Sequence, residues 1–148
     1  MRFILIDRIV SLVPGTSVVA ARSVRPDEDY FCDHFPGFPV VPGVLLVEMM
    51  AQTAGKCLDA ERRPRGKAML AKILSASFRQ WVRPGDETLI HASIVANDER
   101  YAVGECRVEV GGRAAAQSKL FFSFLPTGQL SRDFRDDLLE DFLAEQPR

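Results

Sequence analysis

The chain has 148 residues, of which 47% are hydrophobic and 26% charged, as in an ordinary globular domain with enough chain for a sizeable core. Its formal net charge is −1, so there is no general electrostatic attraction to nucleic acid or anionic lipid, and neither is expected as a partner. No apolar run is long enough to span a bilayer.

The chain opens with MRFILIDRIV, an apolar run interrupted by Asp7 and Arg8. This run is too short for the core of a signal peptide, and no small-residue cleavage site follows it. Cys32, Cys57 and Cys106 do not have the spacing of metal ligands. We predict that they are reduced thiols, two of them core fillers, in a cytoplasmic protein without a metal site.

The first half of the chain combines a strand signal, a stiff loop and a long helix. Residues 16–24 are β-rich and follow a Pro14-Gly15 turn signal, and prolines and glycines punctuate residues 33–43. From Gly43 the chain contains helix formers and no proline for about four helical turns. The helix is apolar nearly all round, so we expect it to be buried on most sides.

Three polar residues interrupt this apolar helix, namely Glu48, Gln52 and Lys56. Their spacing of four residues places them in one stripe along the helix. Polar side chains in line on a buried helix indicate a groove or an interface.

The second half reads mainly as strands. Residues 67–78 are ambiguous by pattern, whereas 88–96, 101–110 and 113–125 have strand character. The remaining signals are turns at 82–86 and 97–100 and a two-residue Gly111-Gly112 hairpin, together with the charged run RRPR at 62–65. A strand meander with one long buried helix predicts an α+β fold with the sheet packed on the helix.

Residues 126–148 differ from the rest, and we divide the chain into a domain at 1–125 and a tail at 126–148. Ser131 is a candidate N-cap for an amphipathic helix. The tail either packs as a lid on its own domain, which we favour, or docks another chain. Its apolar positions are Leu130, Phe134, Leu138, Leu139, Phe142 and Leu143.

His34 and Glu48 bring a base and an acid into a largely apolar segment. A histidine side chain exchanges a proton near neutral pH, and burial favours the neutral, proton-carrying form of a carboxyl group. One base and one acid suit an elimination, in which a C–H proton is removed and a leaving hydroxyl is protonated. The backbone N–H of Gly43, at the positive end of the helix, could polarise a thioester carbonyl. A loop histidine and a capping glutamate without catalytic roles would give the same pattern.

The segment HFPGFPVVPGVLLVEMMAQ at 34–52 resembles the signature of the bacterial 3-hydroxyacyl-acyl-carrier-protein dehydratases of the FabZ type, in the FabA-like hot-dog family. It matches every fixed position of the pattern H-F-P-G-x-P-x-x-P-G-V-L-x-x-E-x-x-A-Q. The likeness extends over about residues 3–125, with FILIDRIVSLVPG near the start and VRPGD at 82–86. Glutamate rather than aspartate at position 48 resembles the branch that dehydrates without isomerising.

The resemblance implies a hot-dog fold, in which an antiparallel sheet wraps one long helix and two protomers join their sheets edge to edge. It implies dehydration of (3R)-hydroxyacyl thioesters on acyl carrier protein, in fatty-acid, acyl or polyene synthesis, without a cofactor. It also implies a homodimer or a trimer of dimers, with active sites at the dimer interface.

Site residues carry over from the family motif position by position. His34 matches the catalytic histidine and Glu48 the catalytic glutamate, contributed by opposite subunits. The Gly43 amide matches the donor to the thioester carbonyl, and Gln52 matches a supporting helix glutamine. We add Phe35 and Val44, which adjoin His34 and Gly43, as substrate-binding residues.

The sequence departs from the family at a few positions. Asp33 stands where glycine is usual, although aspartate tolerates a left-handed backbone better than most residues. Leu74, Ser77 and Trp81 replace an aspartate, an arginine and a proline in a segment near the acyl tunnel. These changes leave the catalytic pair alone, but the family's chain-length preference and mode of carrier docking do not carry over to this sequence.

Two alternatives stay open at this point. One is a hot-dog thioesterase, in which an acidic residue of the central helix activates water and the products are a free acid and a thiol. The other is a non-catalytic relative that binds an acyl carrier, with the extra tail serving a scaffold. The basic run at 62–65 could meet the acidic carrier protein, although a solvated loop is the more common role of such a run.

Overall fold

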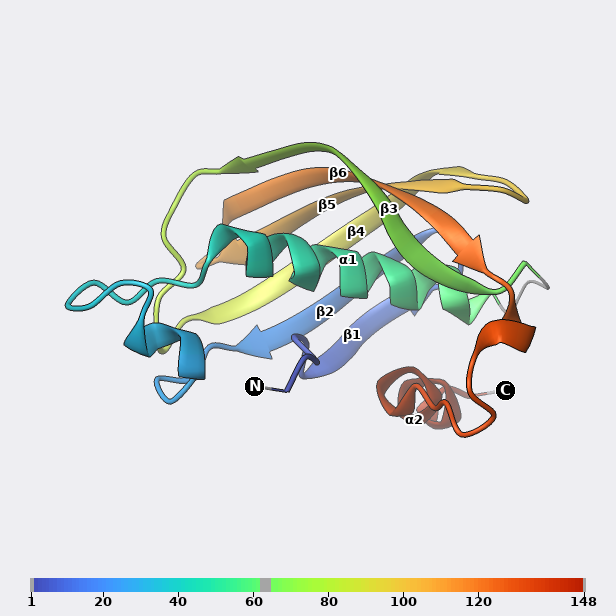
Figure 1. The fold of residues 1–148 in the computed structure, drawn as a ribbon, viewed down its shortest axis with the longest axis horizontal. Coiled ribbons are helices and arrows are strands. Elements are labelled where there is room, and N and C mark those ends of the chain that lie inside the picture. The colour runs from blue at the N-terminus through green and yellow to red at the C-terminus, as the bar shows by residue number, and fades with distance from the viewer. Residues whose placement is uncertain (1, 62–64, 148) are drawn as a thin grey trace.

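The computed structural model describes residues 2–61 and 65–147. Within these residues an antiparallel sheet in the order β1-β2-β4-β5-β6-β3 curves around helix α1 (Figure 1). The strands are β1 (Arg8–Val13), β2 (Ser17–Ser23), β3 (Lys67–Phe78), β4 (Glu87–Asn97), β5 (Ala102–Val110) and β6 (Arg113–Leu125). The helices are α1 (Gly43–Ala60) and α2 (Asp137–Glu145), with short 3₁₀ helices at Asp29–Cys32 and Thr127–Gln129. This confirms the predicted α+β hot-dog fold with an added C-terminal helix.

The core lies between α1 and the concave face of the sheet. Ile90 pairs with Ala20 on β2 and with Val108 on β5, and none of the three side chains is exposed to solvent. Directly opposite residues on neighbouring strands point to the same face, so this register stacks apolar side chains against the helix. The alternation of side chains along β2, β4 and β5, together with this register, thus gives the three strands one continuous apolar face.

Helix α1 begins where the sequence predicts, with Pro42 at its N-cap position, and runs for 18 residues, or about 27 Å. Met49, Met50, Ala54 and Cys57 are fully buried. The helix is in contact with β2 to β6, because its apolar surface extends over most of its circumference. The prediction of a helix buried on most sides is confirmed.

The hairpin between β5 and β6 also forms as predicted. Gly111 and Gly112 have φ angles of 58° and 78°, the left-handed values that a two-residue type I′ turn requires. Of the cysteines, Cys57 and Cys106 are buried in the core and Cys32 is exposed, and all three are free thiols. No helix of the described residues is long and apolar enough to cross a membrane.

The ambiguous segment 67–78 is strand β3, which pairs along its length with β6 and forms an edge of the sheet. Only Ala68 of this strand is buried. Ala and Leu in the segment would favour a helix, but pairing with a strand almost fifty residues later decides the outcome. The second edge of β3 has no partner strand within the described residues.

The tail contains a helix, but the prediction of Ser131 as its N-cap is wrong. Helix α2 starts at Asp137, and Asp136 caps it by accepting the backbone N–H of Leu139 at 3.3 Å. The Ser131 hydroxyl instead accepts the N–H of Asp133 at 3.2 Å in a separate turn. Leu139 belongs to the core, and Phe142 packs against it. This packing favours the tail as a cover on its own domain; the division into a domain at 1–125 and a tail at 126–148 stays a prediction.

Candidate functional site

His34 lies in the loop between the first 3₁₀ helix and α1, and three contacts hold it there. Its backbone N–H donates to the Tyr30 carbonyl at 2.9 Å, and its own carbonyl accepts the Val40 N–H at 3.1 Å. The ring Nδ1 lies 3.3 Å from the Val40 carbonyl oxygen. A carbonyl can only accept, so this contact places the proton of a neutral ring on Nδ1 and leaves Nε2 with a free lone pair. His34 is thus oriented as a base acting through Nε2.

The loop around His34 is stiffened by its own turn. Phe35 and Phe38 exchange two backbone hydrogen bonds of 3.1 and 2.9 Å, and Gly37 between them has a φ of 77°, which favours glycine. The Phe35 ring stacks on the His34 ring with centroids 4.2 Å apart, and the peptide bond between the two residues is cis. Asp33 has a φ of −110°. Its backbone is therefore not left-handed, and the replacement of the usual glycine by aspartate needs no special tolerance of that conformation.

Glu48 lies half-buried on α1, one turn before Gln52. The Gln52 side chain donates from Nε2 to Glu48 Oε1 at 3.0 Å and to the Phe3 carbonyl at 3.1 Å. Its Oε1 accepts the N–H of Leu5 at 2.9 Å. The N-terminal segment therefore positions Gln52, which in turn fixes one oxygen of the Glu48 carboxyl group and leaves the other available.

Gly43 is the first residue of α1, where a backbone N–H has no acceptor within its own helix and lies at the positive end of the helix dipole. A Cβ at this position would lie 3.1 Å from the ring of Phe78 on β3. Glycine therefore keeps a narrow approach to its amide open. Val44 follows it and is 76% exposed.

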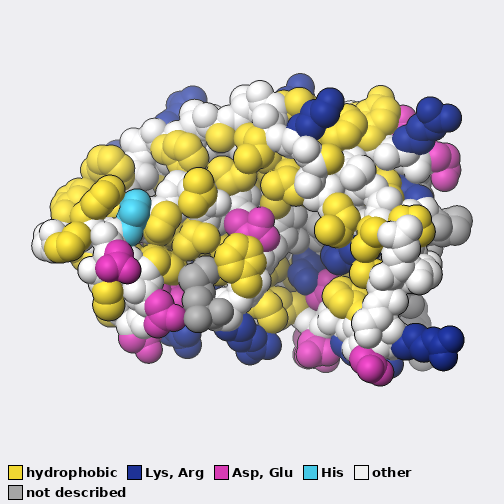
Figure 2. Space-filling view, in the orientation of Figure 1, with side chains coloured by type: hydrophobic (Ala, Val, Ile, Leu, Met, Phe, Trp, Pro, Cys, Tyr) yellow, Lys and Arg dark blue, Asp and Glu magenta, His cyan; other side chains and the backbone are white. Residues whose placement is uncertain are grey.

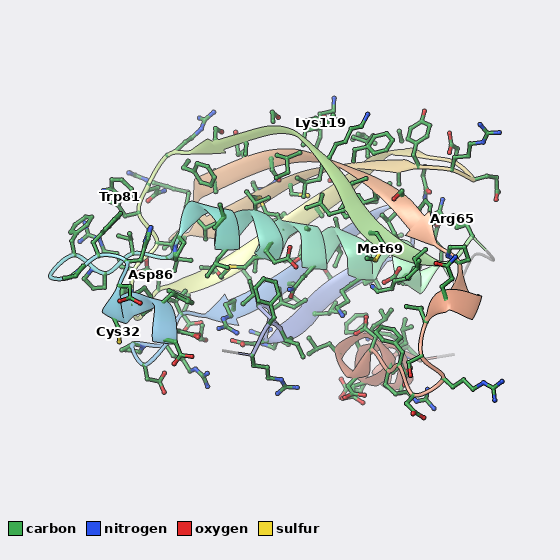
Figure 3. All side chains as sticks on the ribbon, viewed as in Figure 1. Cys32, Arg65, Met69, Trp81, Asp86 and Lys119 are labelled. Atoms are coloured by element: carbon green, nitrogen blue, oxygen red, sulfur yellow. The ribbon has the colours of Figure 1, made fainter. Side chains whose placement is uncertain are left out.

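A groove of about 800 Å³ runs along the open side of α1. Glu48, Gln52 and Lys56, the predicted polar stripe, all line it, together with the N-terminal segment, the start of β3 and the tail. Met69 of β3, labelled in Figure 3, forms part of its wall. The prediction that the stripe marks a groove is therefore confirmed.

A single chain does not bring all the candidate residues into this groove. Its lining includes Glu48 and Gln52 but not the loop with His34 and Phe35, nor Gly43 and Val44 at the helix start. The loop and the helix start lie instead at the end of the molecule where hydrophobic side chains cover much of the surface (Figure 2). The exposed apolar residues of this end and of β3 are Phe35, Phe38, Val44, Met69, Leu70, Ile73, Leu74, Phe78 and Trp81.

Of the residues that depart from the family pattern, Leu74 and Trp81 belong to this surface. Trp81 is 62% exposed, and its ring meets Phe38 edge-on with centroids 5.8 Å apart (Figure 3). The Arg83 guanidinium also lies over the Phe38 ring, 5.1 Å from its centre. The replacement of proline by tryptophan therefore adds an aromatic contact to the loop that carries His34.

The basic run at 62–65 falls outside the described residues except for Arg65. Arg65 forms an ion pair of 2.7 Å with Glu61, and its guanidinium lies 4.0 Å from the centre of the Phe124 ring. Docking of a carrier protein on this run stays a prediction.

One polar network beneath the His34 loop was missed by the sequence analysis. Arg22 is only 7% exposed and pairs with Glu28 and, at 3.3 Å, with Asp7. Close by, burial together with the Glu28 carboxylate raises the pKa of Tyr30 to about 12. The signal for this network was an arginine in the otherwise apolar strand VVAARS, which implies a buried partner. It anchors the 3₁₀ helix whose Tyr30 carbonyl holds His34.

A sheet in this strand order wrapped around one helix, with a groove along that helix, defines a hot-dog protein. Solved structures agree: smu.793 from Streptococcus mutans, bound to acetyl CoA, has a TM-score of 0.66 at 16% identity, covering 85% of this chain and 94% of that one. A chain of the dehydratase heterocomplex ApeI:P from Xenorhabdus doucetiae has a TM-score of 0.61 at 19% identity, over 78% of this chain and 96% of that one. At these identities the likeness concerns the fold alone.

Sequence comparison is more specific. The model of the FabA-like domain matches residues 1–119. The 3-hydroxyacyl-[acyl-carrier-protein] dehydratase FabZ of Lactiplantibacillus plantarum is 39% identical over 117 residues, which cover 78% of this chain and 80% of the relative. The FabZ of Ligilactobacillus salivarius is 40% identical over 120 residues, covering 80% and 86%. The chain therefore belongs to the FabA-like family, among the relatives of FabZ.

Proposed function

We propose that this protein dehydrates (3R)-hydroxyacyl thioesters on acyl carrier protein to trans-2-enoyl thioesters, in fatty-acid synthesis or a related acyl or polyene pathway. The observation that carries the proposal is the intact motif from His34 to Gln52 in a chain 39–40% identical to relatives named as 3-hydroxyacyl-carrier dehydratases. The acid and the base of that motif are the two groups that the reaction requires.

In the proposed mechanism His34 Nε2 removes the proton at C2 of the acyl chain. The C–H electron pair becomes the C2–C3 double bond, and the C3–O bond breaks as Glu48 gives a proton to the departing hydroxyl group, which leaves as water. The Gly43 N–H donates to the thioester carbonyl oxygen while negative charge develops there. Gln52 occupies Oε1 of Glu48, so the other carboxyl oxygen carries the transferred proton.

The proposed active unit is a homodimer, alone or within a trimer of dimers. Two observations support it. His34 and Glu48 do not line one groove within a chain. Strand β3 also presents an edge with which no other strand of the described residues pairs, flanked by exposed Met69, Leu70, Ile73 and Leu74. Pairing of two β3 edges would cover apolar surface and satisfy backbone groups. It would also give each Glu48 access to the His34 of the partner subunit.

The proposal extends to a cytoplasmic location, supported by three unpaired cysteines, which fit a reducing compartment. Phe35 and Val44 complete it as contacts for the acyl chain, since both are apolar, exposed and close in sequence to the groups assigned to the reaction.

The test is incubation of the purified protein with a series of 3-hydroxyacyl carrier proteins, followed by mass spectrometry of the carrier-bound product. We expect loss of one water from the acyl chain, with the thioester intact. Release of a free hydroxy acid would indicate a thioesterase instead. Retained carrier binding without any chemistry would indicate a non-catalytic relative.

A further inference from the structure

We propose that the C-terminal segment 130–145 forms the end wall of the acyl groove and restricts the enzyme to shorter acyl chains, with the Lys56–Asp136 ion pair holding the wall in place. The inference deepens the proposed function and rests on it. It concerns a part of the chain beyond residue 119, where the match to the FabA-like domain ends.

The groove is continuous from the proposed acid to the tail. Glu48 and Lys56 line the same groove, two helical turns apart, which corresponds to a rise of about 12 Å. Phe134, Asp136 and Leu138 of the tail line it as well. Figure 1 shows α2 beside the C-terminal half of α1, below the first strand of the sheet. An acyl chain that extends from Glu48 along α1 therefore runs toward the tail.

The tail is anchored at this end of the groove by a buried side chain and an ion pair. Leu139 is 6% exposed in the core, with Leu138 and Phe142 packed against it. Asp136 caps α2 and at the same time pairs with Lys56 Nζ. The side chains of Lys56 and Asp136 are only 15% and 13% exposed, so this pair is better shielded from solvent and salt than a surface ion pair.

The tail adds charged groups to the lining of the groove. Between Glu48 and Lys56 the groove has a small or apolar strip formed by Ala51, Gly55 and Phe122. The charged residues that line the groove outside the tail are Arg2, Asp7, Arg25, Glu48, Lys56 and Lys67. A Cβ at Gly55 would contact nothing within 4 Å, which leaves free space at this point. The tail places three carboxylates and a guanidinium in the lining beyond this strip. These charged lining residues are Arg135, Asp136, Asp137 and Asp141.

Methylene groups gain free energy in the first part of the groove, because apolar surface leaves water. Beyond Lys56 they would displace water from charged groups without replacing its hydrogen bonds, which is unfavourable. The end wall therefore discriminates between acyl chains by their length. Short acyl chains end before they reach it, whereas long acyl chains meet its charged groups. Loss of the ion pair or of the buried anchor should let the tail yield to a long chain.

The experiment uses full-length variants and compares kcat/KM for 3-hydroxypalmitoyl and 3-hydroxybutyryl carrier protein. Asp136→Asn removes the charge but keeps a good N-cap residue, and Leu139→Ala removes the buried anchor. Each should raise the long-to-short ratio at least about tenfold. Glu140→Gln is the matched control, since Glu140 is exposed on the same helix and does not line this groove. It should keep the wild-type ratio.

Amide hydrogen exchange of residues 139–143 reports release of the tail in the same samples. If the ratio of kcat/KM for the long to the short substrate stays at the wild-type value in both variants, the tail is not the end wall of the groove. This holds whether or not these amides exchange faster. If Leu139→Ala fails to fold, Asp136→Asn decides the question alone. If the wild-type protein dehydrates no member of the 3-hydroxyacyl carrier protein series, the proposed function is wrong and the wall with it. If it dehydrates the series but the variants keep the wild-type ratio, only the wall is wrong.

Discussion

Gln52 joins Glu48 to the N-terminal segment through the two ends of one amide group. Its Nε2 lies 3.0 Å from Glu48 Oε1, while its Oε1 accepts the Leu5 N–H at 2.9 Å. A backbone N–H can only donate, so the amide cannot turn round without losing this bond. The donor end of Gln52 is therefore presented to the carboxyl group of Glu48. A residue close to the N-terminus, Leu5, thus helps to determine the geometry of the proposed acid.

Gln52→Leu should lower kcat roughly ten- to a hundredfold, because the Glu48 carboxyl group would lose the contact that positions it. KM should change much less, because Gln52 is assigned no contact with the substrate. Steady-state kinetics that separate kcat from KM test this. Gln117→Leu, on the opposite face of the sheet among polar neighbours, is the control. An unaltered kcat in Gln52→Leu would contradict the positioning role.

Gly43 allows the backbone donor to be removed with little other change. Proline is favoured at the first position of a helix and lacks an N–H, and the preceding Pro42 already has the extended conformation that a following proline requires (φ −54°, ψ 134°). Gly43→Ala adds a Cβ near Phe78 but keeps the donor, and it is the matched control. We expect kcat of Gly43→Pro to be roughly a hundredfold or more below that of Gly43→Ala. Equal rates for the two variants would exclude the amide as the carbonyl donor.

His34→Ala and Glu48→Gln should each lower the rate by roughly a hundredfold or more while the assembly persists. If the two groups come from opposite subunits, mixed dimers of the two variants contain one intact site. Random pairing makes half of the dimers mixed, so co-refolded variants should recover about one quarter of the wild-type rate. Size-exclusion chromatography and mass spectrometry verify the mixing. No recovery in verified mixed dimers would mean that both groups act from one chain.

His91 should make the protein less stable in weak acid. Burial between β2 and β5, together with the Arg107 cation, lowers its pKa below the ordinary 6.5, against the opposing effect of the Glu109 carboxylate 3.4 Å away. The unfolded chain then binds the proton more readily than the folded one. The contribution of neutral His91 to the free energy of unfolding is therefore fully present above about pH 6.5, the pKa in the unfolded chain. It is lost as the pH falls from there through the lower pKa of His91 in the folded protein.

The measurement is the free energy of unfolding in urea at a series of pH values for wild type and His91→Gln. The difference between the two proteins should change between about pH 7 and pH 5 in the direction that favours the variant. The effect should be modest, because the His91 side chain is 24% exposed. A difference that is independent of pH would contradict the lowered pKa of His91.

Several features were predictable because they depend on residues close together in the chain. Pro42 and Gly43 set the start of α1, and Gly111 with Gly112 supplied the two left-handed positions of a hairpin. The Glu48–Gln52 contact follows from a spacing of four residues on a helix. The sequence also carried the motif that leads to the dehydratase family, since that pattern occupies nineteen consecutive positions, 34–52.

Other features depend on partners far away in the chain. Asp136, not Ser131, caps the last helix, and its carboxylate is also held by Lys56, eighty residues earlier. Residues 67–78 could form a helix or a strand until β6 pairs with them. The contact of Gln52 with Leu5 and the buried pairing of Arg22 with Glu28 likewise require the finished fold.

By itself, then, the sequence determined the start of α1, the β5–β6 hairpin and the chemical groups of the candidate site, because neighbouring residues impose backbone geometry through sterics and short-range hydrogen bonds. Only the tertiary structure decided that the N-terminal segment holds Gln52 against Glu48, that the tail lines the groove and that His34 does not line the groove of its own chain. These depend on side chains brought together by burial of apolar surface. That driving force has no direction of its own, so the register of the sheet determines which groups meet.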